Sequence, residues 1–150
     1  MAVIFAIACQ MERSPFIEAA RGADLREVRL GESRYHLMMP ADFNLYEARG
    51  KEGQLGYGIT PNDKTSEMNG FVEIRAGNPI RGDYSASDGT RKYARSNLLN
   101  KEVTWTISQS PKGYYTAYTR EPGDLSARAS SKNLEEVDKM ISYIATLQIK

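Results

Sequence analysis

His36 is the only histidine in the 150-residue chain, and its side chain is the best candidate for general acid–base chemistry near neutral pH. A hydrolase would place a nucleophilic serine or cysteine beside such a histidine, with a carboxylate to orient the imidazole ring. The sequence has no Gly-x-Ser-x-Gly motif, no glycine-rich phosphate loop and no pair of histidines at metal-binding spacing. We therefore expect a protein that is not an enzyme, with His36 as an ordinary strand residue. A small hydrolase that uses His36 with Asp or Glu partners is the alternative.

A second group of residues could bind a cation. Oxygen-bearing side chains alternate from Asp83 to Asp88, as in a calcium-binding loop. In an EF-hand, however, Gly89 would come one position earlier, and Ala94 stands where a bidentate glutamate belongs. The sequence therefore predicts a turn-rich loop, no metal site and no cofactor. A looser calcium site that includes Asn62 and Asp63 is the alternative.

Residues suited to protein recognition are more plentiful. Tyrosine buries a large area at low entropic cost while it keeps a polar hydroxyl, and three tyrosines lie between positions 114 and 118. Alternate members should face opposite sides of a strand, and we expect Tyr115 to face outward. The segment 77–101 has no clear period and is rich in turn residues and cations, which is typical of a functional loop. The expected partner-binding residues are Asn62, Asp63, Asp83, Tyr84, Asp88, Arg91, Lys92, Arg95 and Tyr115.

The net charge of +1 gives no general attraction to nucleic acid, so the expected partner is a protein. No run reaches the ~18 apolar residues of a membrane span. With a single cysteine, Cys9, the chain can form neither an internal disulfide nor a Cys-based zinc site. Its stability must therefore come from packing.

The first nine residues combine an apolar run, Ala2 to Ala8, with Cys9. The sequence Ala6-Ile7-Ala8-Cys9 resembles the lipobox of bacterial lipoproteins. This resemblance implies that residues 1–9 are a signal remnant, that Cys9 carries a lipid, and that Gln10, which is not Asp, directs the protein to the outer membrane. The protein would then lie in the periplasm and contact the membrane through its lipid anchor only. The alternative is a buried strand over residues 2–8, with Cys9 as a small buried hydrophobe.

Beyond the signal, residues 10–24 mix charges with Pro15 and Gly22 and are expected to be a tether with at most one helical turn. Residues 25–150 are expected to form a single α+β domain, because their length and the chain's 41% apolar content suffice for one core. Turn residues separate six stretches with strand character, namely 26–30, 34–39, 43–47, 54–60, 70–75 and 102–108, and residues 114–119 complete a hairpin with the last of them.

A helix should close the domain. Asn133 can cap it, Glu136 would complete a capping box, and an apolar stripe follows at helical spacing, formed by Leu134, Val137, Ile141 and Ile144. The sequence therefore predicts an antiparallel β-sheet of hairpins covered by a C-terminal amphipathic helix.

Two motifs within this pattern resemble the PsbP-like domain. They are the run from Tyr35 to Phe43, which contains Pro40-Ala41-Asp42-Phe43, and the strand from Asn69 to Arg75, followed by the final helix. The resemblance spans residues 34–149 and implies a PsbP-like fold. That family includes envelope lipoproteins and immunity proteins of type VI secretion systems. It implies an immunity protein that neutralises a secreted cell-wall-degrading toxin by blocking its active cleft, with an envelope assembly or structural lipoprotein as the alternative.

Overall fold

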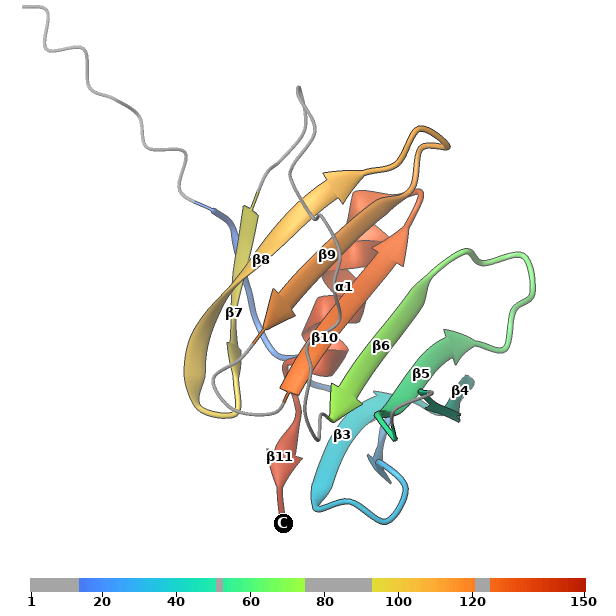
Figure 1. The fold of residues 1–150 in the computed structure, drawn as a ribbon, viewed down its shortest axis with the longest axis vertical. Coiled ribbons are helices and arrows are strands. Elements are labelled where there is room, and N and C mark those ends of the chain that lie inside the picture. Colours follow the sequence, from blue (N-terminus) through green and yellow to red (C-terminus); the bar gives the residue numbers. More distant parts are fainter. Residues whose placement is uncertain (1–13, 51–52, 75–92, 121–124) are drawn as a thin grey trace, which may run out of the picture.

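The computed structural model describes residues 14–50, 53–74, 93–120 and 125–150. These residues form two β-sheets and one helix (Figure 1). The elements in chain order are β1 (Phe16–Ile17), β2 (Leu25–Arg29), β3 (Tyr35–Pro40), β4 (Phe43–Arg49), β5 (Leu55–Pro61), β6 (Asn69–Ile74), β7 (Tyr93–Leu98), β8 (Lys101–Gln109), β9 (Tyr115–Arg120), β10 (Leu125–Ser131), α1 (Leu134–Ile144) and β11 (Gln148–Ile149).

The larger sheet has eight strands in the order β1-β7-β8-β9-β10-β6-β5-β4, and the smaller has three in the order β11-β3-β2. Among the described strands only β1 and β7 run parallel, because the other neighbours pair as antiparallel ladders. The prediction of an α+β protein with antiparallel sheets and a C-terminal helix is therefore confirmed.

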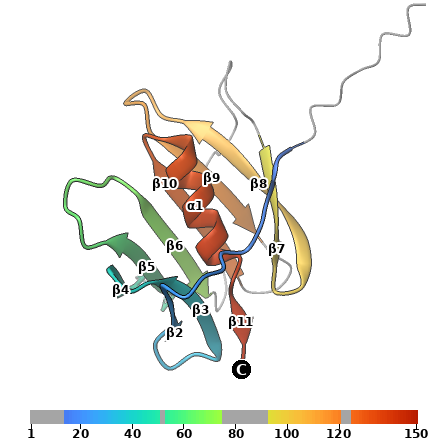
Figure 2. The ribbon, with the colours of Figure 1, turned by 180° about the vertical axis from the view of Figure 1, so that it is seen from behind.

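The core lies between the large sheet and α1, which crosses one face of β10, β6 and β9 (Figure 2). In β8, Val103, Trp105 and Ile107 point into this core and are buried, as their alternation predicted. Leu37 and Met39 of β3 belong to the same buried cluster, so the small sheet shares the core. We call the face of the large sheet that packs on α1 the inner face and the opposite one the outer face.

The N-terminus of α1 differs in detail from the expected capping box. The Asn133 side chain accepts a hydrogen bond from the Glu135 amide at 2.8 Å, as expected of an N-cap. The Glu136 carboxylate, however, accepts from the Ser66 hydroxyl at 3.3 Å, and the Asn133 amide donates to the Ser131 hydroxyl at 3.3 Å. Glu136 therefore holds the connection between β5 and β6, residues 62–68, against the start of the helix.

Replacing Asn133 with alanine is expected to lower the free energy of unfolding by about 0.5–2 kcal/mol, because the first turn of α1 loses its side-chain acceptor. Chemical denaturation followed by circular dichroism measures the change. Lys139→Ala, an exposed substitution later in the same helix, is the matched control and should leave the midpoint nearly unchanged. Equal stability of Asn133→Ala and the parent protein would show that the cap contributes nothing.

Four strands were not predicted, namely β1, β7, β10 and the two-residue β11. β7 occupies part of the segment 77–101, which we expected to be irregular, and β10 is absent from the predicted elements. β1 lies inside the expected tether of residues 10–24, where Phe16–Ile17 pair with β7 and the Ala20 amide donates to the Ser142 carbonyl at 2.9 Å. This part of the segment therefore belongs to the folded structure.

The one helix in the described ranges, eleven residues long, is too short to cross a membrane.

Candidate functional site

A groove lies on the outer face, where strands β4, β5, β6 and β10 run side by side. It consists of two adjoining pockets of about 340 and 370 Å³ that are open to solvent and share Ala48, Phe71 and Arg128 as lining residues. We call it the outer-face groove. The first pocket is also lined by Arg49, Gly50, Gln54, Gly56 and Glu73, and the second by Tyr46, Asn69, Gly70, Thr116 and Ser130.

Register explains how these residues meet. Gly58 of β5 lies opposite Tyr46 of β4 on one side and opposite Phe71 of β6 on the other. Phe71 in turn lies opposite Arg128 of β10. Because residues opposite one another in a ladder share a face, β4, β6 and β10 each place one polar or aromatic side chain around the same depression, and β5 contributes a glycine between them.

Glycines in β5 make room for the two aromatic rings. A Cβ atom at Gly56 would lie 2.2 Å from Phe71 Cζ, and a Cβ atom at Gly58 would lie 1.9 Å from Tyr46 Cζ. The rings therefore lie across β5, where any other residue would collide with them. Glycine weakens a strand interior, so two of them at alternate positions indicate that the rings' placement matters to the structure.

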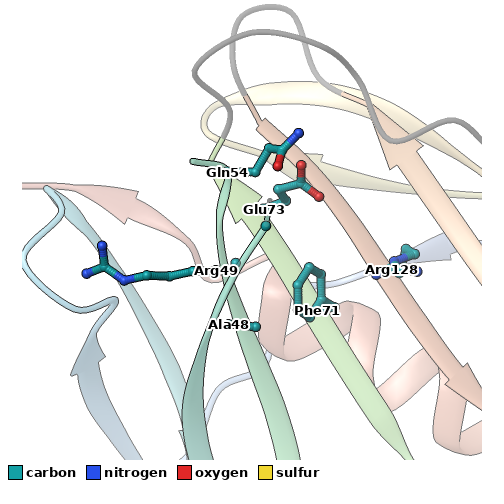
Figure 3. A pocket seen from close by; sticks show the side chains of 8 residues that line it. Ala48, Arg49, Gln54, Phe71, Glu73 and Arg128 are labelled. Carbon is teal, nitrogen blue, oxygen red and sulfur yellow. The ribbon is translucent and has the colours of Figure 1, made fainter. Parts of the chain in front are cut away.

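Arg128 is the most unusual side chain of the groove (Figure 3). Its guanidinium carbon lies 4.8 Å from the centre of the Phe71 ring, a cation–π contact. Its Nε is buried and has no hydrogen-bond partner in the described part of the chain. Arg49, by contrast, points away from the groove, and its Nε donates to Glu47 Oε1 at 3.0 Å.

Glu73 lies beside Gln54 at one end of the groove (Figure 3). Only 6% of Glu73 is exposed, and it has an interaction of its own. Ser126, opposite Glu73 on β10, has a buried hydroxyl that lacks a hydrogen-bond partner among the described residues. The groove thus combines aromatic rings, a cation and a buried carboxylate on a solvent-facing sheet.

The predicted partner-binding residues that the structure describes do not form one site. Asn62 and Asp63 follow β5, whereas Arg95 lies in β7, which is separated from β5 by four intervening strands. Tyr115 faces inward, since it shares the face of buried Ala117 and packs against the core. The outward orientation predicted for Tyr115 is therefore wrong, and Tyr118 of the same strand takes the outer position opposite Arg128.

Two of the predicted residues have structural partners. Arg95 forms an ion pair with Glu102 at 2.8 Å, donates to the Ser14 carbonyl at 3.3 Å and lies 5.8 Å from the centre of the Phe16 ring. It thereby fastens β1 to the sheet. Asp63 Oδ1 accepts hydrogen bonds from the Thr65 hydroxyl at 2.7 Å and the Thr65 amide at 2.9 Å, and both lower the pKa of the Asp63 carboxyl.

The remaining predicted positions, Asp83, Tyr84, Asp88, Arg91, Lys92 and Cys9, lie outside the described residues. This also holds for most of the calcium-like loop. Within the described ranges, no group of three or more His, Cys, Asp and Glu side chains is arranged to hold a metal ion.

His36 lies in the middle strand of the small sheet. It is partly buried, opposite Arg29 of β2 and Gln148 of β11. His36 does not line either pocket of the outer-face groove. This is the strand position that the sequence predicted for it.

Sequence reasoning missed Phe71, Glu73 and Arg128 as site residues. The sequence showed Phe71 and Glu73 as alternating residues of a strand, but no neighbouring residue in the sequence indicated that their face of the sheet is open to solvent. The pattern Gly56-Tyr57-Gly58, with glycines on one face of a strand, was the usable signal for rings lying across it.

Comparison of the chain with protein-family models, with curated proteins and with solved structures finds no match. The site must therefore be interpreted from its own chemistry.

Proposed function

We propose that this chain is a non-enzymatic binding protein that holds another protein against the outer face of its large sheet. The single observation that supports this proposal best is the outer-face groove, with Tyr46 44% exposed at its rim and Arg128 stacked on Phe71 at its centre. Tyr and Arg are the residue types that most often dominate the energy of protein interfaces. Pockets of this size, open and shared between strands, suit single side chains of a partner better than an enclosed ligand.

The specific function we propose is that of a PsbP-like immunity protein. It would be anchored in the periplasm by a lipid on Cys9 and would neutralise a secreted cell-wall-degrading toxin by covering its active cleft. The support comes from the resemblance of residues 6–9 to a lipobox, from the strand that leads into Pro40 and Phe43, and from the late helix. Occlusion requires only a stable complex, so the protein itself needs no catalytic residues.

The test is to mix the purified protein with each cell-wall hydrolase encoded beside its gene. We expect one of them to form a stoichiometric complex on size-exclusion chromatography and to lose its activity against peptidoglycan. Tyr46→Ala should weaken this complex by about tenfold or more, because the partner would lose its contact with the exposed ring at the rim of the groove. Lys139→Ala, on the exposed side of α1, is the matched control and should bind like the parent protein.

Two results would contradict the proposal. One is the absence of a complex with any neighbouring hydrolase. The other is a complex that Lys139→Ala disrupts while Tyr46→Ala leaves it intact, since the partner would then lie on the helix side.

A further inference from the structure

β4 is an edge strand with a regular hydrogen-bonding pattern. It ends the large sheet and, at seven residues, is the longest of the four strands that end a sheet in the described ranges. At one end of its ladder with β5, the Gly50 amide donates to the Gln54 carbonyl at 2.7 Å. At the other end, the Asn62 amide donates to the Asp42 carbonyl at 2.9 Å. The ladder between these two bonds is continuous, so its alternation fixes which backbone groups of β4 remain for another strand.

The backbone groups of every second residue of β4 point away from β5. Bonded pairs alternate in an antiparallel ladder, so residues 44, 46 and 48 bond to β5 together with residues 42 and 50. The N–H and C=O groups of Leu45, Glu47 and Arg49 therefore face the opposite side, where no described strand pairs with β4. The Phe43 carbonyl, which points the same way, accepts from Arg26 Nη2 at 2.9 Å. We call the row formed by Leu45, Glu47 and Arg49 the β4 edge, and such a row is a template for a further strand.

Open pockets adjoin the β4 edge on both faces of the sheet. Tyr46 and Ala48 line the outer-face groove. Glu47 lies opposite buried Tyr57 on the inner-face side, and both residues line a further pocket of about 440 Å³ that is open to solvent. We call this the edge pocket. Side chains of a strand added to β4 would alternate between the groove and the edge pocket. In β-strand addition, main-chain hydrogen bonds give affinity and such pockets give specificity.

The edge pocket has a net negative lining. Its charged residues are Glu47, Arg49 and Glu32 of the turn between β2 and β3. Arg49 is paired with Glu47 at 3.0 Å, so the charge of exposed Glu32 is not balanced within the lining. A Lys or Arg side chain of an added strand would complement this charge, whereas Asp or Glu would be repelled.

We infer that the protein partner adds an extended strand to the β4 edge and directs a Lys or Arg side chain to the edge pocket. Its backbone bonds to Leu45, Glu47 and Arg49, and its alternate side chains lie over the outer-face groove beside Tyr46. This inference rests on the proposed function, because it names the element by which the partner reaches the same groove.

The test does not need the partner. The isotopically labelled protein is mixed with the peptide acetyl-Val-Lys-Val-Lys-Val-Lys-Val-amide, and amide hydrogen exchange is followed by NMR. We expect the Leu45, Glu47 and Arg49 amides to exchange fast in the free protein and about tenfold or more slowly with saturating peptide. The Tyr46 and Ala48 amides, which bond to β5, should stay slow throughout. A peptide methylated on the backbone nitrogens of its lysines keeps the charge but cannot donate to β4, and it should slow none of them.

The charge of the edge pocket is tested with the same peptide. Replacing its lysines with glutamate should weaken binding severalfold, and so should Glu32→Lys. Glu18→Lys makes the same charge change at an exposed position outside the edge pocket and is the matched control, which should bind like the parent protein. Equal binding of the lysine and glutamate peptides, or of Glu32→Lys and Glu18→Lys, would contradict the choice of a cationic side chain.

Three outcomes would overturn strand addition itself. One is slow exchange of the Leu45, Glu47 and Arg49 amides in the free protein, since this chain or a second copy would then already cover the edge. The others are no slowing with the peptide and equal slowing with its methylated form. Because this titration uses no hydrolase, its failure is distinct from a failure to find a complex. A complex with the proposed partner in which these three amides still exchange fast would contradict the inference and leave the proposed function standing.

Discussion

Replacing Trp105 with alanine is expected to lower the free energy of unfolding by about 3–5 kcal/mol, the largest effect of any single substitution proposed for this chain. Trp105 is the only tryptophan of the protein, is fully buried on the inner face of β8, and donates from Nε1 to the Ser96 hydroxyl at 2.9 Å. Alanine would leave a cavity between the large sheet and α1, and the buried Ser96 hydroxyl would lose its hydrogen-bond donor.

Trp105→Phe separates the two contributions, because phenylalanine fills much of the space but cannot donate to Ser96. It should cost about 1–3 kcal/mol, the penalty for an unsatisfied buried group with some loss of packing. Denaturation followed by far-ultraviolet circular dichroism compares all three proteins without relying on tryptophan fluorescence. A Trp105→Ala protein within about 1 kcal/mol of the parent would contradict the inner-face core described here.

The second large effect concerns binding. Gly56→Val should weaken the complex with the proposed partner by about tenfold or more while it changes stability less than Trp105→Ala does. A Cβ atom at Gly56 would lie 2.2 Å from Phe71 Cζ, so the ring must move, and Arg128 would lose the surface on which it stacks. The strand itself should tolerate valine, because valine has a higher β-propensity than glycine.

Thr104→Val is the matched control for this prediction. It also places valine on the outer face of the large sheet, but in β8, among residues that do not line the outer-face groove. Isothermal titration calorimetry of both variants against the same hydrolase measures the difference. Equal affinity of Gly56→Val and Thr104→Val would show that the arrangement of Phe71 and Arg128 does not contribute to binding.

The elements with strong local patterns were predictable from the sequence. The hairpin of β8 and β9 has clear alternation, with Trp105 between Val103 and Ile107 on the buried face, and α1 has an N-cap and an apolar stripe. The hairpin of β2 and β3 was predicted from a glycine-containing turn, and Gly31 indeed has a positive φ of 57°. In each case, residues close in sequence carry the whole signal.

β7 and β10 were not predictable, because small and polar residues occupy their buried positions. In β10 the inward residues include Ala127, Ala129 and Ser131, and in β7 Ser96 faces the core as the acceptor for Trp105. Small side chains allow the helix to lie close to the sheet, but they give no apolar alternation to detect. The outer-face groove could not be predicted from the sequence either. Its residues come from four different strands, and the pairing of those strands is known only from the structure; they include Tyr46, Gly56, Phe71 and Arg128.

The central claim is that a protein partner covers the outer-face groove, and hydroxyl-radical footprinting of the complex with the proposed partner tests it most directly. Tyr46 and Tyr93 make a matched pair, since they are 44% and 47% exposed in the free protein, yet only Tyr46 lines the groove. We predict that complex formation protects Tyr46 from oxidation and leaves the oxidation rate of Tyr93 unchanged. An unchanged rate at Tyr46 in a stoichiometric complex would contradict the account.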